Sequence, residues 1–269
     1  MRPRHRPRTG WSRRESNGPQ LGAVDVILSD LWYWGGILPS LHLARICSTI
    51  GLDIGVHSGT ERFKRLYTPA ITDVLDGYGL RHQYLRHSIR PLDPTQMVAG
   101  PAFTIAGVKD ASTDIARRMG PRVIDHMRPG IVAVYDTGGD DTTGVWGELW
   151  SAGAAIRGCA GAVVDGGIRD TGFIRRARFP IFYRFTSPAD AVGRFTVADF
   201  ECPVVAGGVR VHPGDYIFGD EDGVVVIPKA LTFDVLAKAE EVGRREDRIR
   251  AAITPDKSLA ELYVEHGKF

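Results

Sequence analysis

Cysteine is scarce in this chain of 269 residues, and its three cysteines lie far apart. Cys47, Cys159 and Cys202 form no Cys-x-x-Cys pair, so the spacing indicates neither a zinc ribbon nor a framework of paired disulfides. This use of cysteine fits a reducing compartment, and we expect a cytoplasmic protein.

Long hydrophobic runs are also missing. The most apolar stretch, residues 21–50, is interrupted by charged or ionisable side chains before it reaches the roughly 18 uncharged residues that a membrane helix needs. These interruptions are Asp25, Asp30, His42 and Arg45. We therefore expect no membrane span.

A strong overall charge is absent, since the net charge is only +2. The first twenty residues carry six arginines and one glutamate, a charge of +5, which leaves −3 for the remainder. Prolines and glycines are interspersed with these arginines, so we expect a frayed, solvated terminus and no nucleic-acid partner.

The composition changes near residue 58, and we predict an N-terminal extension over 1–58 and a catalytic domain over 59–269. The extension begins rich in Arg and Pro and continues into LWYWGGILPS, where Trp32, Tyr33 and Trp34 are typical of packing anchors. We expect the extension to be partly disordered, with a helix in its second half.

From Thr60 onward, helical and extended patterns alternate, which predicts a layered α/β core with crossover connections. TERFKRLYTPAITDVLDGYG indicates two short helices, MVAGPAFTIAGV a bent strand or strand pair, and STDIARRMGPRVIDHM a helix. The same alternation continues as strand IVAVYD, helix GELWSAGAAIRGC, strand AGAVVDG, helix TGFIRRAR and strand FPIFYRF.

After Ala191 the pattern changes to short strands separated by turns. The turns at 213–215 and 220–223 are expected to bring consecutive strands together in a β-rich half. A helix is predicted from Leu231 to Ala251, with i,i+4 ion pairs from Glu240 to Arg244 and from Glu241 to Arg245 on a solvated face. A short helix, SLAELYVEH, follows.

Two loops hold the densest group of chemically useful residues. These are TGGDDTTGVWGELW, after the strand IVAVYD, and VVDGGIRD, which continues from the strand AGAVV. Ligands of open α/β sheets bind at the carboxyl ends of the strands, so both loops are expected to face one pocket. The site hypothesis rests on this geometry.

The residue types in these loops suit an anionic oxo acid. A helix that begins near Gly147 presents free N–H groups at its positive end. Arg169 supplies a planar set of donors for a carboxylate or enolate, and Asp170 is a hard oxygen ligand for Mg²⁺ or Mn²⁺.

A purely structural interpretation of the same residues stays open. An Arg-Asp dipeptide after glycines often caps a helix, and here the dipeptide stands directly before Thr171. Asp140 and Asp141 are common turn formers, and Glu148 in a first helical turn favours the helix dipole.

The order of motifs resembles that of the RraA-like proteins, which include aldolases for 4-hydroxy-4-methyl-2-oxoglutarate (HMG) and 4-carboxy-4-hydroxy-2-oxoadipate (CHA). The resemblance runs from about Thr60 to Ala251 through TPAITDVLDGYG, MVAGPAFTI, DTGGDDTTGVWGELW, GAVVDGGIRD and PGDYIFGDEDGVVVIP. It implies a layered α/β/β sandwich of the swivelling-domain type, a homotrimer, and the metal-dependent lyase chemistry of class II pyruvate aldolases.

Active members of this family share an acidic residue, twenty intervening residues, Arg-Asp, and a second acidic residue three positions on. Glu148, Arg169 and Asp170 match this pattern. The resemblance implies that Arg169 and Glu148 are catalytic and that Asp170 holds the metal. It also implies that Gly147, Glu148, Leu149 and Trp150 line the substrate site together with Arg169.

The departure is Phe173, which stands where the pattern has the second acidic residue. Acidic groups around a metal usually orient its waters, so this change is expected to weaken metal affinity or to alter substrate preference. Asp140 or Asp141 is the expected acidic replacement.

Pyruvate release by aldol cleavage and decarboxylation of oxaloacetate are both expected, because the two reactions leave the same enolate. The alternative is a non-catalytic regulator that binds the endonuclease RNase E, as some family members do. A methyltransferase, another label such sequences carry, lacks support because no glycine-rich loop for S-adenosylmethionine is present.

Overall fold

The computed structural model describes residues 26–30, 53–57, 66–114, 119–255 and 258–266. The chain divides into two compact units, 1–59 and 60–269. In the first unit, β1 (Val26–Asp30) and β2 (Asp53–His57) form a parallel pair. The helix and the packing anchors Trp32, Tyr33 and Trp34 expected in the extension lie outside the described residues.

The second unit is built on four parallel strands in the order β4–β5–β7–β8. These strands are β4 (Val98–Lys109), β5 (Val132–Asp136), β7 (Gly161–Ile168) and β8 (Ile181–Thr186). All eight residues of β7 are buried, as expected for a central parallel strand covered on both faces. Every strand predicted in this part of the chain is present, and β4 is the bent strand, with a register shift between Ala106 and Gly107.

Antiparallel strands extend this sheet at both ends. Beyond β4 lie β12 (Tyr216–Gly219) and β13 (Val224–Ile227), and beyond β8 lies β3 (Arg90–Pro91). β9 (Phe195–Phe200) also pairs with β4, and β6 (Gly144–Trp146) pairs in parallel with β7.

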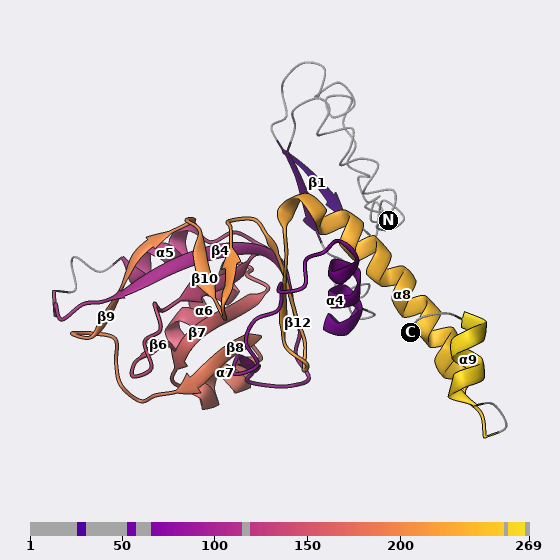
Figure 1. Ribbon diagram of the computed structural model, residues 1–269. Helices are drawn as coiled ribbons and strands as arrows, with labels where there is room; N and C mark the ends of the chain where they lie inside the picture. Colours follow the sequence, from indigo (N-terminus) through magenta and orange to yellow (C-terminus); the bar gives the residue numbers. More distant parts are fainter. Residues whose placement is uncertain (1–25, 31–52, 58–65, 115–118, 256–257, 267–269) are drawn as a thin grey trace, which may run out of the picture. The chain divides into compact units, whose positions relative to one another are not determined.

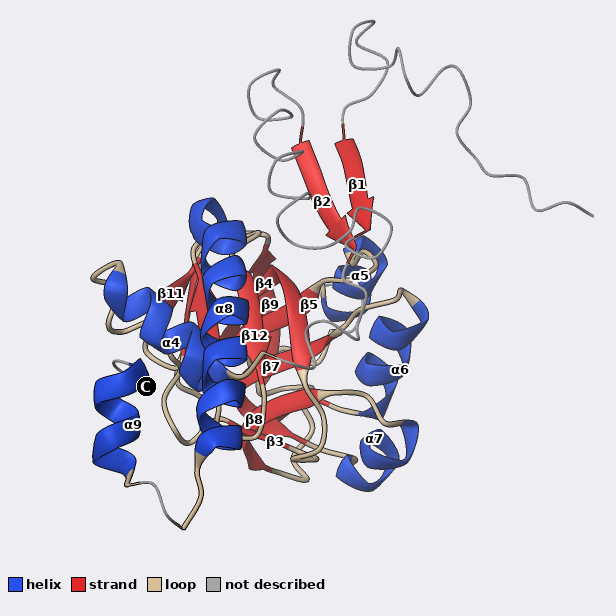
Figure 2. Ribbon diagram, turned by 90° about the vertical axis from the view of Figure 1, so that its right-hand side faces the viewer, coloured by secondary structure: helices blue, strands red, loops and turns tan. Residues whose placement is uncertain are grey.

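Helices flank the sheet on two sides, as Figures 1 and 2 show. α5 (Gly120–His126), α6 (Glu148–Ile156) and α7 (Thr171–Ala177) lie together on one side. α4 (Thr68–Gly77) and the long α8 (Thr232–Ala252) lie on the other side, and the 3-10 turn η2 (Lys229–Leu231) precedes α8. α9 (Leu259–His266) folds back on α8 (Figure 1).

Two apolar clusters form the core, one on each face of the sheet. The first joins the helices α5, α6 and α7 to the sheet through side chains such as Val123, Ala154 and Ile174. The second lies under the hairpin of β10 (Val204–Ala206) and β11 (Val209–Val211). This mixed α/β architecture, with a strand layer on one face, is the predicted fold class.

One strand-pairing prediction is wrong. The turn at 213–215 does not join its two flanking strands, because β11 pairs with β10 whereas β12 pairs with β4 and β13. Asp215 explains the turn's actual role: its buried carboxylate accepts hydrogen bonds from the N–H groups of His212 and Lys229. The turn therefore carries the chain from the hairpin to the edge of the main sheet. The loop at 220–223 does connect paired strands, β12 and β13.

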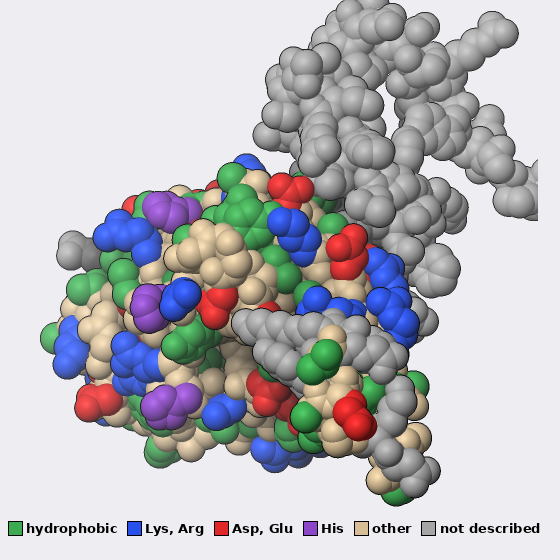
Figure 3. Space-filling model, turned by 45° about the vertical axis from the view of Figure 1, so that its right-hand side comes forward, with side chains coloured by type: hydrophobic (Ala, Val, Ile, Leu, Met, Phe, Trp, Pro, Cys, Tyr) green, Lys and Arg blue, Asp and Glu red, His purple; other side chains and the backbone are tan. Residues whose placement is uncertain are grey.

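Acidic and basic side chains are interspersed on the face seen in Figure 3. None of the helices in the described part of the chain is long and apolar enough to cross a membrane.

Candidate functional site

The site begins where β6 and β7 end side by side. β6 pairs with β7 at Gly144 with Gly167 and at Trp146 with Ile168. The N–H of Arg169 then donates to the carbonyl oxygen of Trp146 at 2.8 Å. Because both strands run in the same direction, the residues that follow them meet at one edge of the sheet.

The start of α6 is fixed by a short hydrogen-bonded chain. The buried indole N–H of Trp146 donates to Ser151 Oγ at 2.9 Å, and Ser151 Oγ donates to the carbonyl oxygen of Gly147 at 3.1 Å. The first turn of α6 is therefore held at the end of β6, and its free N–H groups point out at the site edge.

Gly147 leaves room for the Arg169-Asp170 dipeptide. Its backbone is extended, with φ −134° and ψ −166°, so any residue could adopt it. A Cβ atom there would lie 2.5 Å from Asp170 Oδ2 and 3.2 Å from Arg169 Cγ. The absence of a side chain thus permits the carboxylate to reach the helix start, where the Glu148 N–H donates to Asp170 Oδ2 at 3.3 Å. The expected proximity of the two loops is confirmed.

Asp170 occupies an unusual backbone conformation. Its φ of 56° and ψ of 30° fall in the left-handed region, which aspartate tolerates better than most residues. Although it stands at the N-cap position of α7, its side chain makes no capping hydrogen bond. The carboxylate is directed toward Glu148 and Arg169 instead, so the structural interpretation of this residue as a helix cap does not hold.

Arg169 lies between two carboxylates. Its Nη1 is 3.1 Å from Asp190 Oδ1, and its Nε is 3.6 Å from Asp170 Oδ2. The Arg169 side chain is 36% exposed, which leaves it accessible to a ligand. Sequence reasoning missed Asp190, although the rule that directed attention to the loops after β5 and β7 applies equally to the loop after β8.

A depression of about 320 Å³ opens beside this dipeptide. It is lined by the ends of β7 and β8 and the residues that follow them: Ile168, Arg169, Asp170, Thr171, Thr186, Ser187 and Pro188. Ser187 fixes the β8 side, since its N–H donates to Ile168 O at 3.0 Å and its hydroxyl donates to Thr142 O at 2.6 Å. The pocket therefore has a rigid floor and an open mouth.

Leu149 and Trp150 are placed differently from each other. Leu149 is 81% exposed, whereas the half-buried Trp150 packs on the core, with ring centroids 5.8 Å from Tyr135 and 5.1 Å from Trp146. The side chain of Trp150 is thus committed to packing. Any contribution of these two residues to the site through the helix start would come from the backbone.

Comparison with known proteins identifies relatives of this chain. The family model RraA-like (Aldolase/RraA) matches residues 68–226, which is more than half of the chain. The chain belongs to the RraA-like family.

Several relatives extend this match. A protein of Halalkalibacterium halodurans, provisionally named a 4-hydroxy-4-methyl-2-oxoglutarate aldolase, is 34% identical over 76% of this chain and 92% of its own length. Protein DlpA of Legionella pneumophila is 32% identical over 73% of this chain, which covers only 32% of DlpA.

Solved structures agree with the RraA-like fold. Streptomyces coelicolor RraAS2, described as an unusual member of the RNase ES inhibitor RraA protein family, has a TM-score of 0.63 and 30% identity over 71% of this chain and 94% of its own. An uncharacterized protein of Pseudomonas syringae has a TM-score of 0.66 and 27% identity over 75% of this chain and 94% of its own.

Phe173 departs from the pattern of the RraA-like aldolases, and the structure shows what surrounds it. The ring is 53% exposed on α7, and the Arg176 guanidinium carbon lies 4.4 Å from its centroid. This cation–π contact is formed one turn along the helix from Asp170. The position thus carries an aromatic ring that contacts an arginine in place of a carboxylate.

Asp140 does not offer a replacement for the missing acidic group. The residue is 2% exposed, and its carboxylate accepts hydrogen bonds from Thr142 Oγ1 at 2.9 Å and from the Thr143 N–H at 2.9 Å. Burial acts to raise the pKa of Asp140, but the hydrogen bonds from Thr142 and Thr143 outweigh it and hold that pKa below its ordinary value. Asp140 therefore stabilises the turn, and Asp141 is exposed.

The donor set of the RraA-like site fits a hard divalent cation held mainly by water and substrate. In the ranges that the structure describes, no three His, Cys, Asp or Glu side chains converge to enclose a metal ion. Mg²⁺ does not require such a cage, because it is often held by one or two carboxylates and keeps several waters. Asp170 suits this role, since its carboxylate is 41% exposed, does not cap α7 and accepts a hydrogen bond of 3.3 Å from the Glu148 N–H.

Gly147→Ala should change the geometry of the site without destabilising the fold. The added Cβ would lie 2.5 Å from Asp170 Oδ2, so the carboxylate must move while the backbone stays unstrained. We expect roughly a 10- to 100-fold loss of metal affinity or activity, as is typical when the surroundings of a metal ligand are disturbed. Metal titration and a thermal melt would measure the two effects.

Gly172→Ala is the matched control. Its Cβ would meet only Arg176 Nη1, at an ordinary 3.7 Å, two residues after Asp170. Alanine in this helix should be neutral or stabilising by up to about 1 kcal/mol. Equal losses of metal affinity in both variants would contradict the role given to Gly147.

Proposed function

We propose that this protein is a metal-dependent lyase that cleaves a 4-hydroxy-2-oxo acid of the HMG or CHA type to release pyruvate. The observation that carries the proposal is the meeting of the α6 start with Arg169 and Asp170 at the ends of β6 and β7. The provisional name of the H. halodurans relative supports the same chemistry.

Asp170 is the proposed ligand for Mg²⁺ or Mn²⁺. When bound, the cation supplies Lewis acidity and withdraws electrons from the 2-oxo acid. The carboxylate of Asp170 is held by the Glu148 N–H and Arg169, so its direction is set before any ligand binds. This preorganisation removes the need to order the group during the reaction.

Arg169 and the start of α6 bind the anionic substrate. The guanidinium offers a fork of donors to a carboxylate or enolate oxygen, and N–H groups of the first helical turn offer a second set. Gly147 leaves the space that the Asp170 carboxylate and the Arg169 side chain occupy at this helix start. Leu149 and Trp150 contribute backbone at the same helix start, as proposed for the substrate site.

In the reaction, a proton leaves the 4-hydroxyl group, the bond between C3 and C4 breaks, and its electron pair forms the pyruvate enolate. Arg169 stabilises the negative charge that develops on the enolate oxygen. Glu148 orients a water that carries the proton away from the 4-hydroxyl group. C3 of the enolate then takes up a proton to give pyruvate.

The same residues would support decarboxylation of oxaloacetate. Loss of CO₂ from oxaloacetate breaks the equivalent bond and leaves the same enolate at Arg169. Both reactions are therefore proposed activities of one site.

We also propose that the protein assembles as a homotrimer in the cytoplasm. Leu149 is 81% exposed and Ile156 is 86% exposed, both on α6 next to the site. Large exposed apolar side chains in one region are typical of a surface that another subunit covers. Light scattering coupled to gel filtration would measure the oligomeric state.

The deciding assay is pyruvate release from a panel of 4-hydroxy-2-oxo acids and from oxaloacetate, with and without Mg²⁺ or Mn²⁺. Metal-dependent turnover of at least one substrate is expected. Because RraAS2 is described as belonging to an RNase ES inhibitor family, binding to an RNase E-type endonuclease is the alternative. No turnover in the whole panel, together with retention of the endonuclease in a pull-down, would favour that alternative.

Restoration of the acidic residue at position 173 should strengthen metal binding. Phe173 is 53% exposed, so Phe173→Asp is expected to fold. Outer groups around a metal typically change affinity by roughly 10- to 100-fold, and we expect about a tenfold gain for Mn²⁺ by calorimetry.

Arg176 should limit that gain, because its guanidinium lies 4.4 Å from the centroid of the Phe173 ring and would pair with a new carboxylate. The double variant Phe173→Asp with Arg176→Ala is therefore expected to bind Mn²⁺ more tightly than the single variant. The role given to position 173 is wrong if neither variant changes Mn²⁺ affinity.

A further inference from the structure

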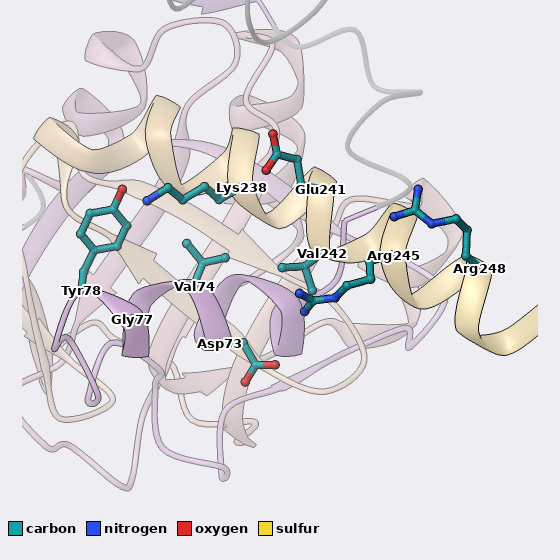
Figure 4. A pocket seen from close by; sticks show the side chains of 9 residues that line it. All are labelled: Asp73, Val74, Gly77, Tyr78, Lys238, Glu241, Val242, Arg245 and Arg248. Atoms are coloured by element: carbon teal, nitrogen blue, oxygen red, sulfur yellow. The ribbon is translucent and has the colours of Figure 1, made fainter. Parts of the chain in front are cut away.

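The long helix α8 and the helix α4 enclose a second depression, far along the chain from the site at β6 and β7. α4 lies within the residues that match the RraA-like model, whereas α8, Thr232–Ala252, lies entirely beyond residue 226, where that match ends. The two helices run side by side (Figures 1 and 4). Their facing residues include Val74 and Val242, at the bottom of a depression of about 470 Å³.

One of the two ion pairs predicted on α8 forms and the other does not. Glu240 Oε2 lies 3.9 Å from Arg244 Nη1, as predicted. Within the described residues, no ion pair joins Glu241 to Arg245, so that prediction is wrong. Figure 4 shows the reason: Arg245 reaches into the gap between α8 and α4, whereas Glu241 extends away from it.

Arg245 is left with an unsatisfied donor. Its Nε is buried and has no hydrogen-bond partner, and it is the one side-chain atom of this kind in the described part of the chain. Buried polar groups in folded proteins almost always have partners, and exceptions call for an explanation such as a missing ion or ligand. Arg245 also lines the depression, and a guanidinium can bind an oxyanion on two of its N–H donors.

The charges around Arg245 favour an anion. Lys238, Arg245 and Arg248 line the depression from one stripe of α8, against the two carboxylates Asp73 and Glu241. In Figure 4 the side chains of Asp73, Glu241 and Arg248 all extend away from the place where Arg245 lies, which leaves the Arg245 guanidinium as the charge within the gap. Lys238 closes the other end, with Nζ 4.4 Å from the centroid of the Tyr78 ring.

We propose that this depression binds a small oxyanion that carries at least two negative charges, such as phosphate or a dicarboxylate, with Arg245 as the central ligand. Lys238 adds positive charge at the Tyr78 end of the depression. The proposal is independent of the lyase chemistry, because it shares no residue with the site at Arg169 and Asp170. Binding of an anion here would tie α8 to α4 and so stabilise the folded chain.

The test is a thermal melt of the full chain in phosphate, in succinate and in NaCl of the same ionic strength. At about five times its dissociation constant, a bound anion should raise Tm by roughly 2–4 °C over NaCl. Phosphate and succinate are tested separately, so the melt shows whether the depression binds an inorganic or an organic anion. The shift should disappear in Arg245→Gln and persist in Arg244→Gln, whose parent residue lies on the same helix but pairs with Glu240.

Arg169→Gln removes the other anion candidate and should keep the shift. If Arg245→Gln fails to fold, Lys238→Gln replaces it and should reduce the shift in part. The proposal is overturned if wild type shows no shift beyond NaCl, if the Arg245 variant keeps the full shift, or if a selenate-soaked crystal shows no anomalous peak within hydrogen-bond distance of Arg245.

Discussion

Arg169→Ala is expected to reduce kcat/KM about 10²- to 10³-fold both for a 4-hydroxy-2-oxo acid and for oxaloacetate. The two substrates should lose activity together, because Arg169 is proposed to stabilise the enolate that both reactions share. The magnitude is that of removing one preorganised donor from the developing negative charge. Steady-state pyruvate release, coupled to a lactate dehydrogenase assay at saturating Mg²⁺, would measure it.

The loss should fall mainly on kcat if Arg169 acts on the transition state, and on KM if it only binds the substrate carboxylate. Arg169→Lys keeps the charge but removes the planar fork, so it should recover only part of the activity. Stability should change by less than about 1 kcal/mol, because the Arg169 side chain is 36% exposed and its ion pairs with Asp170 and Asp190 are solvated.

Arg175→Ala supplies the matched control. Arg175 is an exposed arginine on α7, so the change removes the same charge close to the site. It should leave turnover within about twofold of wild type, because a solvated charge outside the pocket acts only through a screened field. Wild-type turnover in Arg169→Ala, with metal present, would rule out the assigned role.

Much of the sheet and of the site edge could be predicted because hydrophobic runs mark central parallel strands. VAVYD and GAVVDGGI are almost continuously buried, and each is followed by glycines and polar residues where the strand ends. The rule that ligands bind at these ends then placed Gly147 next to Arg169 and Asp170. This part of the fold could be predicted from short segments of the sequence alone.

The pairing of β12 with β4 could not be predicted in this way. The two strands are separated by more than one hundred residues, and the turn at 213–215 between β11 and β12 looks like an ordinary hairpin turn. The buried carboxylate of Asp215 decides the path of the chain, because it binds N–H groups on both sides of the turn. No short sequence pattern marks a hydrogen bond between a side chain and a backbone N–H group that lies far along the chain.

The direction in which each side chain of α8 points could not be predicted either. Glu240 with Arg244 and Glu241 with Arg245 have the same spacing, yet only the first pair forms. The difference lies in which residue of α8 faces α4, and that depends on how the two helices pack. Asp190 was missed for a similar reason: its partner Arg169 lies 21 positions earlier and meets it only after β7 and β8 are aligned.

Asp170→Asn is expected to abolish metal-dependent turnover, with a loss of at least about 10³-fold in kcat. The change replaces a charged oxygen ligand by a neutral amide, which Mg²⁺ and Mn²⁺ bind far less strongly. Asparagine is the appropriate replacement because it tolerates the left-handed φ of 56° at this position, whereas alanine would add backbone strain. Mn²⁺ titration followed by electron paramagnetic resonance would measure binding directly.

The structure predicts that this variant keeps its fold. The Asp170 side chain does not cap α7, is 41% exposed, lies 3.6 Å from Arg169 and accepts a 3.3 Å hydrogen bond from the Glu148 N–H, which the amide oxygen of asparagine can also accept. The free energy of unfolding without metal should therefore change by less than about 1 kcal/mol. Asp222→Asn, at an exposed residue in the loop between β12 and β13, controls for the loss of one negative charge and should leave Mn²⁺ affinity unchanged. Undiminished Mn²⁺ binding by Asp170→Asn would move the metal away from Asp170, and the lyase mechanism would have to be abandoned in this form.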